Sequence, residues 1–98
     1  MTFRLHFMPE AENQLKALKH NASLEKRYKA VKKALQHLQQ NPKHPGLNIH
    51  HFTSMHGPNG EKIWEAYAEN NTPGAYRIFF FYGHIRGMIS ILSIVSHP

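Results

Sequence analysis

A single arginine interrupts the most apolar stretch of this 98-residue chain. Arg77 lies in residues 75–82 (AYRIFFFY), and on a strand its side chain would share a face with Phe79 and Phe81. Because burying a lone guanidinium group is costly, Arg77 either pairs with Glu65 of the preceding predicted strand or remains available for an anion. Phosphate is one such anion, since it matches the planar fork of arginine. Both interpretations stay open.

Histidine is the other residue type that could do chemistry, with nine copies in the chain. His50 and His51 are neighbours on a predicted strand, so they point to opposite faces and cannot share one metal ion. His97 directly follows the last apolar segment, which would hold an imidazole at the sheet edge with a titration range suited to proton transfer. The alternative for His97 is a frayed C-terminal residue.

The residue types that are missing exclude several classes of site. The chain has no cysteine, which excludes disulfides, zinc–thiolate sites, iron–sulfur clusters and thiol nucleophiles. All six acidic residues are glutamate, so the usual aspartate ligands of Mg²⁺ and Ca²⁺ are missing too. We therefore expect no metal and no cofactor. No apolar run approaches the ~20 residues of a membrane span, so we expect a cytoplasmic protein without a membrane partner.

Positive charge is concentrated in the first half of the chain. Residues 1–47 carry nine of the twelve Lys and Arg residues but only three of the six Glu residues. A cationic surface of this kind attracts nucleic acid, an anionic membrane or an acidic protein segment. Composition alone does not choose among these partners, and a solvated basic helix face is the simpler alternative.

Two helices are predicted in that basic half, after a strand. Residues 2–7 alternate between apolar and polar, which is typical of a half-buried strand. A helix is expected over residues 9–20, because proline is well placed in a first turn. A second helix should follow, capped by Ser23 and ended by Asn41-Pro42. Its apolar positions repeat at intervals of four and three residues: Leu24, Tyr28, Val31, Leu35 and Leu38.

The second half is predicted to form four strands, over residues 47–53, 63–69, 75–82 and 88–95. Turn sequences separate them: an Asn-Gly pair in residues 57–60, Pro73-Gly74, and a loop over residues 83–87. The expected fold class is α+β, a single domain over residues 1–98 with two layers. A helical hairpin would cover one face of a mostly antiparallel sheet, with element order β-α-α-β-β-β-β, and leave the other face open.

Three segments together resemble the RelE/ParE superfamily of bacterial type II toxin–antitoxin toxins. They are KALQHLQQNPKHPGLNIH, EKIWEAYAENNTPGAYRIFFFYG and ISILSIVSHP. In that superfamily a basic helical hairpin leads through an NP-x-HPGL-like turn into a sheet. The penultimate strand of the sheet carries YR, and the last strand ends at HP, HD or HY. The resemblance covers nearly the whole chain and implies the RelE-like fold.

For the RelE-like branch, the resemblance implies an mRNA endonuclease that acts in the ribosome without a metal, by attack of the 2′-hydroxyl on the adjacent phosphate. It implies that Arg77 stabilises the phosphorane and that His97 transfers a proton. Glu65 falls where some members have a carboxylate base, and His50 falls where others have a histidine. Such chemistry needs a base, an acid and cationic donors around the phosphate.

The resemblance also implies an RNA-binding surface and partners. Tyr76 would stack a base, Arg86 would bind a second phosphate, and four lysines would track ribosomal RNA: Lys26, Lys29, Lys32 and Lys33. The expected partners are mRNA, the ribosome and a cognate antitoxin, whose acidic or amphipathic segment would fold on binding. Two alternatives remain open: a ParE-like toxin that inhibits DNA gyrase, and a catalytically silent member that only binds RNA or its antitoxin.

Overall fold

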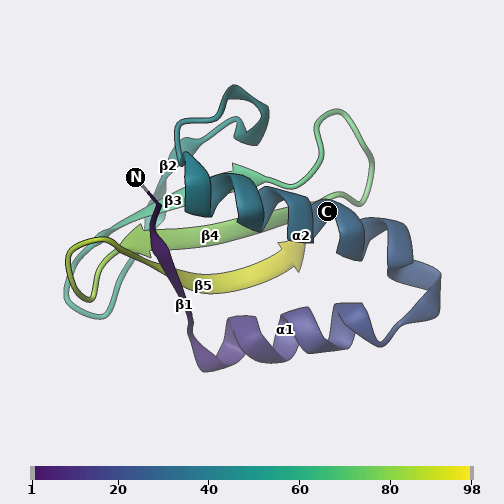
Figure 1. The fold of residues 1–98 in the computed structure, drawn as a ribbon, viewed down its shortest axis with the longest axis horizontal. Coiled ribbons are helices and arrows are strands. Elements are labelled where there is room, and N and C mark those ends of the chain that lie inside the picture. Colours follow the sequence, from purple (N-terminus) through teal and green to yellow (C-terminus); the bar gives the residue numbers. More distant parts are fainter. Residues whose placement is uncertain (1, 98) are drawn as a thin grey trace.

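A helix layer packs on a five-stranded sheet in the computed structural model, which describes residues 2–97 (Figure 1). The elements follow the predicted order: β1 (Arg4–Phe7), α1 (Pro9–Lys19), α2 (Glu25–Gln40), β2 (His50–His56), β3 (Lys62–Tyr67), β4 (Tyr76–Tyr82) and β5 (Met88–Ser96). Short 3₁₀ turns lie at Ala22–Leu24 and Pro45–Leu47. The α+β class with an N-terminal strand, a helical hairpin and a following sheet is therefore confirmed.

The sheet has the strand order β1-β5-β4-β3-β2, with β4 at its centre. β1 pairs with β5 in parallel, and the other three pairings are antiparallel. The prediction of a mostly antiparallel sheet is therefore confirmed. Since β4 is the central strand, Arg77 is held by hydrogen-bonded strands on both sides.

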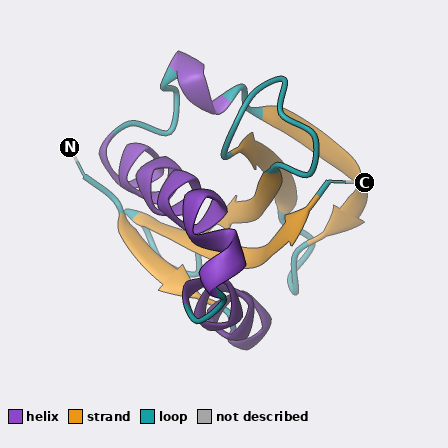
Figure 2. Ribbon diagram, turned by 90° about the vertical axis from the view of Figure 1, so that its right-hand side faces the viewer, coloured by secondary structure: helices purple, strands orange, loops and turns teal. Residues whose placement is uncertain are grey.

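The helices cover one face of this sheet. α2 runs along β4 and α1 lies on the side of β5 in Figure 1, and the two helices pack beside each other in Figure 2. The predicted apolar stripe of α2 turns toward the sheet, where Val31 and Leu38 are fully buried. They meet Ile78 and Phe80 of β4, also fully buried. Because side chains alternate along a strand, Arg77 and Phe79, the two neighbours of Ile78, face away from the helices.

The N-terminal boundary of the second helix differs from the prediction. Ser23 is not its cap. Instead the side chain of Asn21 accepts a hydrogen bond from the Ser23 backbone N–H at 3.1 Å, and a 3₁₀ turn leads into α2. Asparagine favours such local side-chain bonds as strongly as serine does, and here it comes first in the chain.

The strand predicted over residues 47–53 begins later, at His50. Pro45–Leu47 forms a 3₁₀ turn instead, in which Nδ1 of His44 accepts a hydrogen bond from the Gly46 N–H at 3.0 Å. The Pro73-Gly74 turn forms as predicted: Gly74 has φ +73°, and the Ala75 N–H donates to the Thr72 carbonyl at 3.1 Å. That positive φ is the reason for glycine there.

Candidate functional site

Three of the four predicted catalytic residues gather on the sheet face that the helices leave open. His50 lies on β2, Glu65 on β3 and Arg77 on β4. The Cα atoms of His50 and Glu65 are register partners, and Arg77 is the register partner of Tyr67, two residues beyond Glu65. Neighbouring strands therefore bring together residues that are 27 positions apart in the chain. We call His50, Glu65, Tyr67 and Arg77 the Arg77 cluster.

Arg77 forms the ion pair that the sequence left open. Its Nε lies 3.5 Å from Oε2 of Glu65, and the two side chains are only 12% and 16% exposed. The contact is electrostatic rather than a hydrogen bond, because Nε and Nη1 of Arg77 are both buried without a hydrogen-bond partner. Buried donors of this kind are rare in folded proteins. The guanidinium group thus keeps hydrogen-bonding capacity that the protein itself does not use.

Tyr67 holds this cluster together. The guanidinium carbon of Arg77 stacks over the Tyr67 ring, 3.7 Å from its centroid, and the His50 ring lies 5.5 Å from the same ring. A cation over an aromatic face is attracted by the electrons of the ring. Sequence reasoning missed Tyr67, although alternation along the strand places it on the same face as Glu65, two residues earlier.

His97 directly follows β5, and its backbone stays hydrogen-bonded to the sheet. Its backbone N–H donates to the carbonyl of Ala75 at 2.9 Å, which continues the pairing of β5 with β4. Two residues earlier, Val95 is the register partner of Arg77. His97 therefore lies beside the start of the strand that carries Arg77, at one end of the Arg77 cluster.

Two of the predicted RNA-binding residues lie away from the cluster. Tyr76 faces the helix layer and packs half-buried against the hydrophobic core, on the opposite side of the sheet from Arg77. Arg86 is exposed in the loop at the far end of β4. The five steps along the strand from Arg77 to Tyr82, at about 3.3 Å each, put that loop roughly 17 Å away. The structure does not bring either residue to the Arg77 cluster.

The lysines of α2 are all exposed, and α2 covers the face opposite to the Arg77 cluster. Lys29 pairs with Glu25 at 3.3 Å, and Lys32 lies 5.6 Å from the centroid of the Tyr28 ring. Exposed contacts of this type contribute little to stability and leave the charges accessible. Lys26, Lys29, Lys32 and Lys33 therefore form a cationic surface of their own, separate from the Arg77 cluster.

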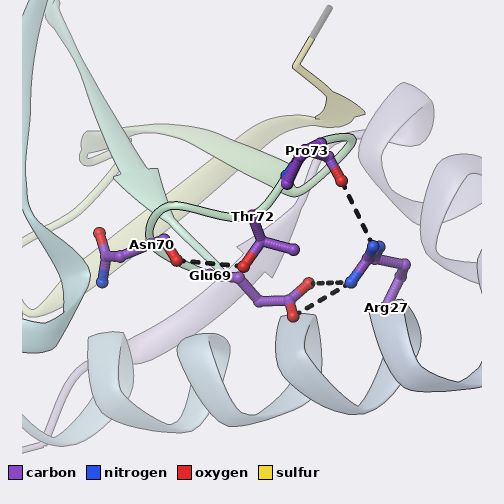
Figure 3. A network of polar contacts seen from close by, with 5 residues as sticks. All are labelled: Arg27, Glu69, Asn70, Thr72 and Pro73. Atoms are coloured by element: carbon purple, nitrogen blue, oxygen red, sulfur yellow. Dashed lines mark hydrogen bonds and ion pairs between the residues drawn. The ribbon is translucent and has the colours of Figure 1, made fainter.

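Arg27, next to these lysines in sequence, has a structural role (Figure 3). Its Nη1 donates to both carboxylate oxygens of Glu69, at 3.0 and 3.2 Å, and its Nη2 donates to the Pro73 carbonyl at 3.3 Å. Within the same turn, the Thr72 hydroxyl donates to the Asn70 carbonyl at 3.0 Å. These contacts tie α2 to the turn that leads into β4, and so help to position Arg77.

The described residues 2–97 contain no group of three histidine or glutamate side chains placed to hold a metal ion. In the same part of the chain, every helix is too short or too polar to cross a bilayer.

No protein-family model matches this amino-acid sequence, and neither does any curated protein. Solved structures that are similar in fold include the following two. One is the archaeal RelE–RelB complex from Pyrococcus horikoshii OT3, with a TM-score of 0.64 and 16% identity over 98% of this chain and 96% of that one. The other is the YoeB dimer from Staphylococcus aureus, with a TM-score of 0.63 and 14% identity over all of both chains. The chain therefore has the expected RelE-like fold, and the Arg77 cluster lies on the open face of its sheet.

Proposed function

We propose that this chain is the toxin of a type II toxin–antitoxin system and cleaves ribosome-bound mRNA in the cytoplasm. Its fold is that of RelE and YoeB, which are RelE-superfamily toxins. One of the two similar structures is a complex of RelE with RelB, and this supports a cognate antitoxin as the partner of the present chain. Because fold alone does not specify an activity, the argument for cleavage rests on the Arg77 cluster.

The observation that carries the proposal is the state of the Arg77 side chain. A buried guanidinium with two unused donor nitrogens on an otherwise apolar strand is a costly arrangement for a purely structural residue. Arginine binds phosphate oxygens in a planar, bidentate way, and a phosphodiester would offer Nε and Nη1 their missing acceptors once the buried side chain turns outward from Glu65. RNA would therefore satisfy Arg77 better than Glu65 does at 3.5 Å.

In the proposed reaction, Glu65 takes the proton of the 2′-hydroxyl, and the 2′-oxygen attacks the adjacent phosphorus. Arg77 stabilises the additional charge of the phosphorane, and His97 donates a proton to the departing 5′-oxygen. The products are a 2′,3′-cyclic phosphate and a free 5′-hydroxyl. His50 is the second candidate for the base, since it lies across from Glu65 on the neighbouring strand. Loss of one preorganised charge donor typically costs a factor of about 10² to 10³ in rate.

The cationic surfaces would bind the remainder of a large substrate. The exposed lysines of α2 would contact ribosomal RNA through its phosphates, and Arg86 would bind a phosphate at the far end of β4. These contacts would be independent of base sequence and weakened by salt. Tyr76 would have to leave its half-buried position to stack a base, so we assign base stacking at the Arg77 cluster to the more accessible ring of His50.

One observation favours a second candidate function. The ion pair of Arg77 with Glu65 occupies both principal catalytic residues, as expected for a catalytically silent member that only binds RNA or its antitoxin. In that case Glu65 serves to neutralise Arg77 instead of acting as a base.

Primer extension on an mRNA that is being translated, with and without the protein, separates these candidates. The wild-type chain should produce defined cleavage ends, and Arg77→Ala should abolish both the ends and the growth arrest of cells expressing it. Arg27→Ala is the matched control: the same residue type is removed from the other Arg–Glu pair, and cleavage per folded molecule should persist. Circular dichroism would verify that both variants fold.

The other outcomes of these assays distinguish the alternative functions. Equal cleavage by wild type and Arg77→Ala would refute the catalytic assignment. Absence of RNA products together with inhibition of gyrase supercoiling would favour a ParE-like activity, and absence of both effects would favour the silent member.

A further inference from the structure

An open groove of about 990 Å³ lies on the helix side of the sheet, where α2 ends and the chain turns toward β2. Its walls are mainly apolar and aromatic and come from four separate parts of the chain. They include Phe3, Pro42, Lys43, Ile49, Trp64 and Tyr82. We call it the aromatic groove.

The aromatic groove exists because the helices do not reach this end of the sheet. α2 stops at Gln40, so the rings beyond it are only partly covered. Tyr82 is 45% exposed, although its ring contacts Phe3 at 5.9 Å and Phe80 at 5.8 Å between centroids. The partial burial raises the pKa of the Tyr82 hydroxyl. Because Tyr82 lies next to the partly buried rings of Phe3 and Trp64, the three rings form one contiguous apolar surface, the kind of surface on which partners dock.

The surroundings of the groove are positively charged. Lys43 lines the groove itself, and a second hollow of about 470 Å³ adjoins it at Phe3 and is lined by Arg4 and Arg86. No glutamate lines either hollow among the described residues. The combined surface therefore offers an apolar trough with one cation along it and two at one end, which complements a segment carrying apolar anchors and a few carboxylates.

These features favour a peptide over a nucleic acid as the occupant. A single-stranded RNA needs a row of cations along its backbone, and the groove itself contains only one, Lys43. The rest of the wall mixes apolar side chains, which pack well against apolar anchors, with uncharged polar ones that can hydrogen-bond a peptide backbone: Pro42, Pro45 and Ile49, and Gln40, Asn41, His44 and Asn48.

We infer that the aromatic groove is the docking site of an acidic peptide segment with aromatic or aliphatic anchors, supplied by the antitoxin. This inference rests on the proposed function for the identity of the partner and adds its location. Trp64 faces the groove, whereas its neighbour Glu65 belongs to the Arg77 cluster on the other face. The segment therefore anchors the antitoxin without filling the cluster, and a further part of the antitoxin must reach the open face to inhibit cleavage.

Selection of peptides from an unbiased random display library, using the full-length chain as bait, tests the inference without any enzyme assay. The selected peptides should combine acidic residues with aromatic or aliphatic ones. Trp64 is the sole tryptophan of the chain, so binding should change its fluorescence directly. Fluorescence titration with each selected peptide then measures affinity.

Two pairs of variants locate the binding site. Tyr82→Glu should weaken peptide binding at least tenfold, whereas Met55→Glu, which alters a similarly exposed apolar residue on β2, should leave it unchanged. Lys43→Glu should weaken binding about tenfold, whereas Lys19→Glu on α1 should not. Because Lys43 is exposed, its substitution keeps the test decisive even if Tyr82→Glu fails to fold.

The inference is overturned if no peptide is recovered, if the recovered peptides are basic, or if they bind the Lys43→Glu variant as well as wild type. It is also overturned if a single-stranded RNA 12-mer changes Trp64 fluorescence and displaces the peptides. None of these results bears on cleavage, which the Arg77→Ala experiment decides separately. Conversely, loss of the nuclease proposal would leave a confirmed peptide groove in place.

Discussion

Two arginine–glutamate pairs join distant parts of this molecule and differ in how well they are satisfied. Arg27 and Glu69 are 26% and 21% exposed and share two hydrogen bonds, with a third from Arg27 to a carbonyl. Arg77 and Glu65 are more deeply buried, at 12% and 16%, yet approach only to 3.5 Å and leave two donor nitrogens without partners. The more buried pair therefore has the poorer geometry.

That difference separates a structural contact from a functional one. Desolvation makes a buried charge expensive, so a pair selected for stability alone should have its best hydrogen bonds where burial is greatest. The Arg27 pair has the hydrogen bonds expected of a partly buried structural pair, and it fastens α2 to the turn before β4. The Arg77 pair departs from this rule, which is typical of a residue whose full set of acceptors arrives with a ligand.

Arg77→Lys should give the largest effect. Lysine keeps the positive charge but loses the planar fork, so we expect mRNA cleavage to fall by about 10³, near the upper range for loss of one charge donor. Arg27→Lys should alter cleavage per folded molecule less than about twofold. Single-turnover cleavage rates on the same mRNA measure both. Similar losses for the two variants would mean that the pairs do not differ in function.

Glu65→Gln should reduce cleavage by about 10², because a general base typically contributes a factor of that size or more. Glu69→Gln is the matched change in the other pair and should leave the rate unchanged once the folded fraction is taken into account. If Glu65→Gln instead preserved cleavage and tightened RNA binding, Glu65 would only neutralise Arg77, and His50 would become the base to test.

Tyr67→Leu should lower cleavage about fivefold to tenfold. The stacked ring holds the Arg77 guanidinium, and a desolvated cation–aromatic contact contributes on the order of 1 kcal/mol. Tyr67→Phe keeps the ring and should retain most of the rate. Comparing the two variants by the same cleavage assay separates the ring from the hydroxyl, and an equal loss in both would assign the effect to the hydroxyl.

Arg27→Met should destabilise the fold by about 1 kcal/mol, since it leaves the half-buried Glu69 carboxylate without its partner while keeping most of the apolar contact. Urea unfolding followed by circular dichroism measures the change. The cleavage rate of the folded fraction should not change. An Arg27→Met chain as stable as wild type would show that the geometry of this pair contributes nothing measurable.

The smallest expected effect is a pH dependence at the other end of α2. The rings of His37 and His44 stack at 4.0 Å, and desolvation, followed by the nearby His44 and Lys33, lowers the pKa of His37 below its ordinary 6.5. The folded state thus favours neutral His37, so its contribution to stability is complete above about pH 6.5 and declines as the pH falls through the lowered pKa.

The urea midpoint should therefore fall slightly more between about pH 7.5 and pH 5 for wild type than for His37→Gln. An identical decrease in both proteins would show that His37 does not contribute to the pH dependence.

Much of the fold follows from local patterns in the sequence. The four-three repeat from Leu24 to Leu38 produced the buried face of α2, and Pro73-Gly74 produced the predicted turn. The predicted starts of α2 and β2 were less accurate, because local hydrogen bonds in the preceding turns competed with the helix and the strand. Asn21 caps the 3₁₀ turn that precedes α2, so Ser23 does not cap the helix, and the turn at Pro45–Leu47 delays the start of β2.

The sequence by itself determined which residues share a face, because alternation along a strand is a property of the backbone. It placed Arg77 beside Phe79, away from the helices, and named Glu65 as its possible partner. Only the tertiary structure decided that this ion pair forms, that the Tyr67 ring stacks against Arg77, and that Arg27 forms an ion pair with Glu69. Distances between strands and the competition of several acceptors for one guanidinium depend on register and packing across the whole sheet, which no local pattern encodes.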